Sequence, residues 1–149
     1  MRDQIAAALD DARTRNDPSR LCTLRLIAAA IKDRDIALRS EGRERLDDSG
    51  LADLLACMLR QHEMKAELLR ADGESARADE ERRLAGILAE FLPPPLDAPS
   101  MLAACRKAVE DTGARGLRDV GRCMSALKTA HGAALDLPAA GEMVRGLLR

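Results

Sequence analysis

The segment Leu92-Pro93-Pro94-Pro95-Leu96-Asp97-Ala98-Pro99 divides this chain in two. Three consecutive prolines fix φ, lack N–H donors and favour an extended backbone, so no helix crosses them. A proline-rich segment of this kind is stiff rather than floppy. We therefore expect a proline-rich linker at 93–99, which joins an N-terminal domain at 1–92 to a C-terminal domain at 100–149.

The residues on both sides of this segment favour helices. The 149 residues include 27 Ala and 23 Leu but only 12 Val, Ile and Thr together, and Phe91 is the single aromatic residue. Ala and Leu are strong helix formers, whereas strands favour β-branched and aromatic side chains. The sequence predicts an all-α fold, with four helices in the N-terminal domain and three in the C-terminal domain.

Apolar residues at spacings of three and four place the individual helices. We expect them at about 2–14, 18–40, 50–71, 74–91, 99–112, 117–130 and 138–148. Asp17-Pro18 is typical of a helix start, and Ser49 or Asp48 is expected to cap the third helix. The fourth helix begins with polar residues, so its first half and the charged run at 79–83 are expected to face solvent.

Composition and spacing exclude several classes of protein. No apolar run approaches the roughly 20 residues that a membrane span needs, and the first residues lack the apolar region of a secretory signal. The cysteines lie far apart, without CxxC spacing or a nearby His, at Cys22, Cys57, Cys105 and Cys123. We expect a reduced, cytoplasmic protein that has no metal and no cofactor.

Residues that carry catalysis are not evident in the sequence. The phosphate-binding, metalloprotease and nucleophile-elbow motifs are absent. The cysteines are expected to be small buried hydrophobic residues, although a Cys–His pair assembled in three dimensions stays open. His62 is expected to be a partly buried, hydrogen-bonded residue of its helix, and Asp35 is expected to pair with Arg39 one turn later. No catalytic residue is predicted.

Charge is distributed unequally along the chain, whose net charge is -1. Residues 1–92 carry 16 basic and 19 acidic side chains, a net charge of -3, and residues 93–149 carry 8 and 6, a net charge of +2. In the basic half, Arg115, Arg118 and Arg122 follow one another at spacings of three and four, and Lys128 comes later. Two helical turns are expected to present the three arginines side by side.

Glycines separate these basic residues and let a backbone approach a partner while guanidinium groups reach phosphate oxygens. The predicted nucleic-acid-binding residues are Arg115, Arg118, Arg122, Lys128 and Gly121. An ordinary charged helix start, partly neutralised by Asp119, is the alternative. Because the C-terminal domain has no aromatic residue for base stacking, structured RNA would be recognised by shape and backbone, with strong salt dependence. Neither DNA nor a membrane is expected as a partner.

Three separated parts of the chain resemble the GatB/YqeY family. They are RLCTLRLIAAAIKDRDI at 20–36, EFLP at 90–93, and TGA at 112–114 with DVGRCMSALK at 119–128. The resemblance implies an all-α, two-domain protein whose second domain is similar to the tail of the B subunit of glutamine-dependent aminoacyl-tRNA amidotransferase. In that enzyme the tail helps to hold tRNA. The stretch LDLPAAGE at 135–142 departs from the family, because it lacks the lysine of a Gly-Lys-like run.

The resemblance and the basic loop together predict a non-catalytic helical module that binds tRNA or associates with a tRNA amidotransferase. The expected partners are tRNA and proteins of aminoacyl-tRNA synthesis or amidotransferase proteins. Two alternatives stay open. One is a protein–protein adaptor that uses an exposed helix face. The other, implied by the label that family members commonly carry, is an amidotransferase-like carbon–nitrogen ligase with glutamine as amido-N donor.

Overall fold

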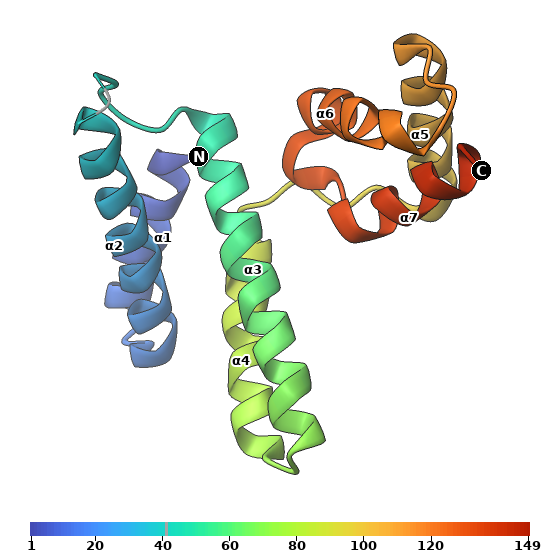
Figure 1. The fold of residues 1–149 in the computed structure, drawn as a ribbon. Coiled ribbons are helices and arrows are strands. Elements are labelled where there is room, and N and C mark those ends of the chain that lie inside the picture. The colour runs from blue at the N-terminus through green and yellow to red at the C-terminus, as the bar shows by residue number, and fades with distance from the viewer. Residues whose placement is uncertain (41) are drawn as a thin grey trace. The chain divides into compact units, whose positions relative to one another are not determined.

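The computed structural model of the protein describes residues 1–40 and 42–149. Within these residues it contains seven α-helices, two short 3-10 helices and no strand, which confirms the predicted all-α fold. Contacts between Cα atoms group the chain into two compact units, Met1–Leu92 and Pro93–Arg149 (Figure 1). That these units fold independently and are joined by a stiff linker stays a prediction.

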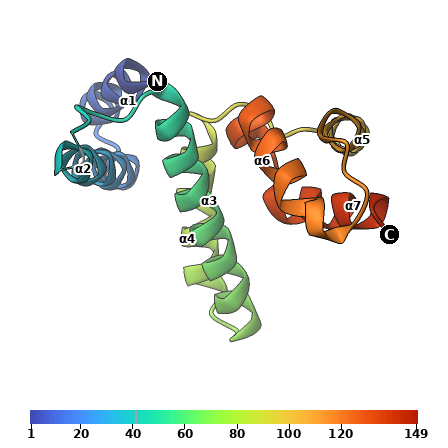
Figure 2. The same cartoon turned by 45° about the horizontal axis from the view of Figure 1, so that its top comes forward.

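The N-terminal unit consists of two antiparallel helix pairs. Its helices are α1 (Arg2–Thr14), α2 (Pro18–Ser40), α3 (Asp48–Ala71) and α4 (Ser75–Ala89). Figures 1 and 2 show α1 beside α2 and α3 beside α4. Buried aliphatic side chains from all four helices build the core, among them Ile5, Leu24, Leu51, Leu55 and Leu88.

The first half of α4 faces solvent as predicted, except at two residues. The turn at 72–74 is short, so α4 returns along α3 and packs against it from its first residues. Ala78 and Glu81 are therefore buried against α3. In the charged run at 79–83 only Glu81 is buried, and the other four residues are exposed as predicted.

Side-chain caps fix the helix starts. The carboxylate of Asp17 accepts the backbone N–H of Arg20 at 2.9 Å, as the helix-start pattern predicted. Asp47, and not Ser49 or Asp48, caps α3, because its carboxylate accepts the N–H of Gly50 at 2.8 Å. The cap of α3 therefore lies one or two residues before the predicted position.

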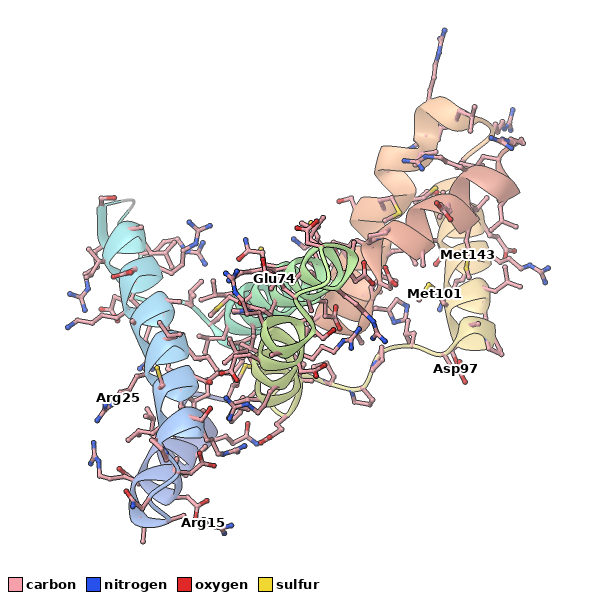
Figure 3. All side chains as sticks on the ribbon, turned by 90° about the horizontal axis from the view of Figure 1, so that it is seen from below. Arg15, Arg25, Glu74, Asp97, Met101 and Met143 are labelled. Carbon is pink, nitrogen blue, oxygen red and sulfur yellow. The ribbon has the colours of Figure 1, made fainter. Side chains whose placement is uncertain are left out.

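The C-terminal unit contains α5 (Ala98–Thr112), α6 (Val120–His131) and α7 (Leu137–Leu147). Asp97 caps α5 by accepting the N–H of Ser100 at 2.8 Å, and Figure 3 labels Asp97 at the start of this helix. Two buried cysteines, Cys105 and Cys123, pack in the small core with Leu127 and Val144.

The end of the proline segment belongs to this second unit. The N–H of Leu96 donates to the carbonyl oxygen of Ala134 at 2.9 Å, in the 3-10 turn Gly132–Ala134 that precedes α7. Leu96 also packs against the apolar core of the unit. No helix in the described ranges is both long enough and apolar enough to cross a membrane.

Candidate nucleic-acid interface

The loop between α5 and α6 carries the arginines that the sequence predicts as an RNA-binding group. Helix α5 ends at Gly113, whose φ of 61° lies in the left-handed region that favours glycine. The chain then runs extended through Gly116 into the 3-10 turn Leu117–Asp119, and α6 begins at Val120. We refer to residues 113–122, which comprise the connection and the first residues of α6, as the α5–α6 loop.

Asp119 organises this loop. One carboxylate oxygen accepts the backbone N–H of Arg115 at 2.9 Å, and the other accepts a guanidinium N–H of Arg122 at 2.8 Å. The hydrogen bond from the Arg115 backbone is the main reason why the pKa of Asp119 lies below its usual value, and the charge of Arg122 contributes to the shift. The ionised carboxylate thus holds both ends of the 3-10 turn.

The three arginines are exposed and close in the chain, but they do not lie on one helix. Arg115 precedes the 3-10 turn, Arg118 lies within it, and Arg122 lies in the first turn of α6. This corrects the prediction that two helical turns present them side by side, because the extended backbone at Gly116 and the 3-10 turn interrupt the helix there. Arg122 pairs with Asp119, whereas the guanidinium groups of Arg115 and Arg118 bind no described acidic side chain.

The two other predicted residues lie elsewhere on α6. Lys128 is exposed in the last turn of α6, at the opposite end of the helix from the loop, and it has an interaction within the chain. Gly121 is exposed, and no atom lies within 4 Å of the position that a Cβ would take. Gly121 therefore does not serve close packing between helices inside this unit.

The cysteines fall into two kinds. Cys105 and Cys123 are buried as predicted, whereas Cys22 and Cys57 are exposed, because they lie on the outer faces of α2 and α3. Burial raises the pKa of the Cys105 thiol, and neighbouring Cys123 adds to the shift, which disfavours a thiolate nucleophile. In the described part of the chain no hydrogen bond joins a cysteine to a histidine, and no group of three His, Cys, Asp or Glu side chains is placed to hold a metal ion.

His62 is a partly buried, hydrogen-bonded side chain, as predicted. Its Nδ1 lies 2.6 Å from one oxygen of Glu81, and Nζ of Lys65 lies 2.5 Å from the other oxygen. Burial raises the pKa of Glu81, but the hydrogen bonds from Lys65 and His62 outweigh burial, so that the pKa lies below its usual value. Glu81 was not predicted as a buried residue, because it lies inside a charged run. Its local signal is the helical spacing from Ala78 and Ala85, which are also buried.

Asp35 does not pair with Arg39 as predicted. Its two carboxylate oxygens accept two hydrogen bonds from the guanidinium of Arg2, at 2.9 and 2.8 Å, and one of them also accepts the N–H of Leu46 at 2.9 Å. The antiparallel packing of α1 on α2 brings Arg2 to this carboxylate, and a bidentate pair is stronger than a surface pair one turn apart.

The chain is similar to a known protein family over nearly its whole length. A family model described as "Yqey-like protein" matches residues 2–148. The match therefore spans both compact units. No curated protein matches the chain significantly.

Proposed function

The chain belongs to the family of YqeY-like proteins, and on this premise we propose that it is a helical module that binds tRNA through the α5–α6 loop. The exposed guanidinium groups of Arg115 and Arg118, which bind no described acidic side chain, carry the proposal. The module is non-catalytic and cytoplasmic. Its protein partners are proteins of aminoacyl-tRNA synthesis or amidotransferase proteins.

The chemistry of the loop supports this proposal. A guanidinium group offers a planar fork of donors that matches two phosphate oxygens. Asp119 already holds the backbone of the loop. The loop therefore loses less conformational entropy when it binds tRNA than a loose loop would lose. Arg122 is shared with Asp119, so its contact with a phosphate replaces an existing exposed ion pair, which costs little. The residues 93–149 have a net charge of +2, which favours an anionic partner.

A titration of labelled tRNA with the full chain, at low and at moderate salt, tests the proposal. We expect affinity that falls with salt. The variant in which Arg115, Arg118 and Arg122 are all replaced by Ala should bind more weakly, with a salt slope reduced by roughly 2 to 3, since each lost phosphate contact removes roughly 0.7 to 0.9.

The matched control replaces three exposed arginines of the N-terminal unit, Arg25, Arg34 and Arg70, by Ala. This variant loses the same net charge, so it should retain the wild-type affinity and slope if the loop is the binding site. Equal losses of tRNA affinity in both triple variants would show that net charge, and not the α5–α6 loop, determines binding. Absence of salt-dependent binding by the wild-type chain would refute the proposal.

A protein–protein adaptor is the second candidate, and one observation favours it. The N-terminal unit exposes four large apolar side chains by more than half of their surface: Leu26, Ile36, Met64 and Leu68. Such side chains are common at interaction surfaces when they gather. Capture of one protein partner by the nuclease-treated full chain, and its loss when Met64 and Leu68 become Asp, would support this function over RNA binding.

A further inference from the structure

A groove of about 310 Å³ lies between α1 and α2 of the N-terminal unit. Its apolar wall is formed by Ile5, Ala6 and Leu9 of α1 and by Ala28, Ile31 and Ile36 of α2. Ile5 and Ile31 are buried at its floor, whereas Ile36 is 53% exposed at its side. The groove is thus an apolar surface that the fold forms and leaves open.

One end of the groove is polar and already formed. The bidentate pair of Arg2 with Asp35 lines this end, and both side chains are also tied to the backbone of Leu46, by bonds of 3.1 and 2.9 Å. The charge of Asp35 is therefore matched by Arg2 without help from a ligand. In Figure 1 this end is where the N-terminus of α1 lies near the C-terminal half of α2.

Two further cations line the same groove. Lys32 and Arg39 are exposed, and neither forms an ion pair with a described residue, although Arg39 is near enough to Asp35 to help keep its pKa low. Their two positive charges are thus in excess at this surface. An anionic group that entered the groove would gain charge-assisted hydrogen bonds from them.

The groove is polarised along its length. Because α1 and α2 are antiparallel, Arg2 faces Asp35 at the charged end, and Leu9 lies towards Ala28 at the other. From Ala28 to Arg39 the helical rise gives a length of about 16 Å. The apolar end lies on the side of the α1–α2 turn, where Figure 3 labels Arg15.

We propose that this groove binds a single-chain acyl carboxylate, with its carboxylate at Lys32 and Arg39 beside Ile36 and its chain along Ile31 towards Leu9 and Ala28. An apolar trough with a few polar groups at one end is typical of small-ligand sites, and about 310 Å³ falls at the lower end of their range. A standard protein interface buries a far larger surface than this groove presents. This proposal is independent of the proposed RNA binding, whose site lies on the C-terminal unit.

The first experiment compares three probes by titration calorimetry on the full chain, all below their micelle concentrations. Decanoate should bind saturably at one site. Decyltrimethylammonium has the same chain with the opposite charge, and butyrate has the same head group with a short chain, so both should bind more weakly. Tight binding of the cationic probe, or no saturable binding of decanoate, would overturn the proposal.

Charge variants test the head group. Replacing Lys32 and Arg39 by Glu should weaken decanoate binding about a hundredfold or more, because each of the two lost charged hydrogen bonds costs about 1.5 to 3 kcal/mol. The control replaces Arg25 and Arg34 by Glu, which changes the net charge equally, since both arginines are exposed on the same helix and neither lines the groove. Equal weakening by the control would show that net charge alone attracts the probe, and the proposal would fail.

Size variants test the chain end. Ala6→Phe places a ring in the groove and should abolish decanoate binding, whereas Ala7→Phe, at the next exposed position outside the groove, should not. Circular dichroism and thermal melting establish that both variants fold. If a second copy fills the groove instead, sedimentation will show a dimer that Ala6→Phe dissolves. That result, or binding of an acidic amphipathic peptide without decanoate, would overturn the proposal.

Discussion

At Glu81, burial and charge act in opposite directions on one carboxylate. The residue is 8% exposed, and such burial disfavours the ionised form. Hydrogen bonds to Lys65 and His62 favour the ionised form more strongly, so the pKa lies below the ordinary value of 4.5. Folding is therefore stabilised by this group above pH 4.5, and the stabilisation is lost as the pH falls through the lower pKa of the folded state.

Glu81→Gln should lower the free energy of unfolding at pH 7 by about 1 to 3 kcal/mol, because Gln cannot satisfy Lys65 and His62 as a charged acceptor. Urea unfolding at pH 7 and at pH 3 measures the effect. The difference between wild type and variant should shrink as the pH falls from 7, because protonation of Glu81 in the wild type removes the charge that Gln lacks.

The control for this variant is Glu80→Gln. Glu80 is exposed and pairs with Arg83 on the same helix face, so its loss should cost about 0.5 kcal/mol or less. If wild type and Glu81→Gln lose stability in parallel between pH 7 and pH 3, the cluster of Glu81, His62 and Lys65 does not contribute in the way described.

At the scale of elements, the end of α5 depends on the backbone conformation of one residue. Gly113 has a φ of 61°, whereas Gly116, three residues later, has a φ of -171°, which any residue adopts. A Cβ at either glycine meets no atom within 4 Å. The two positions thus differ in backbone strain and not in the room available for a Cβ.

Gly113→Ala should destabilise the C-terminal unit by about 1 to 2 kcal/mol, because L residues with a side chain disfavour the left-handed region. Gly116→Ala should leave stability nearly unchanged or raise it by about 0.4 to 1 kcal/mol, through loss of freedom in the unfolded chain. Thermal or urea unfolding of the two variants measures the difference. Equal destabilisation would contradict the role of φ at the end of α5.

At the scale of the whole molecule, the chain has two separate hydrophobic cores. We therefore expect each unit to be stabilised by its own core. Leu55 is fully buried in the core of the N-terminal unit, and Leu127 is almost fully buried in that of the C-terminal unit. A large-to-small change in either core removes buried surface and leaves a cavity. The effect should stay within the unit that carries the change if the two units are independent domains.

Leu55→Ala should cost the N-terminal unit about 2 to 5 kcal/mol and leave the C-terminal unit unchanged, and Leu127→Ala should do the reverse. Hydrogen exchange, resolved by peptide segments, measures protection in 1–92 and in 100–149 separately. Loss of protection in both segments after one substitution would show that the units unfold together, and the predicted two-domain organisation would be wrong.

Local rules predicted the helices well but not their partners. Asp17 as a helix start, Gly113 as a helix end and the seven helix ranges follow from patterns within a few residues. Asp35 instead meets Arg2, 33 positions away, and Glu81 meets His62, 19 positions away. A helical i,i+4 rule selects the nearest charge in the chain and has no access to such distant pairs.

The same limit applies to the α5–α6 loop. The arginines and glycines of this loop are evident in the sequence, and their exposure follows from their polarity. The 3-10 turn and the hydrogen bond that the backbone N–H of Arg115 donates to Asp119 are not evident in the sequence, because they depend on where α5 stops and how α6 packs on it. Exposed Cys22 and Cys57 escaped prediction because a small residue fits either face of a helix.

By itself, the sequence determined that the protein is all-α and, to within about three residues, where its helices lie, since helix propensity, proline geometry and capping act within about one turn. Only the tertiary structure decided which charges meet, which cysteines are buried and that an apolar groove with two cations opens between α1 and α2. Those features join residues that are distant in the chain, and helix packing alone brings such residues together.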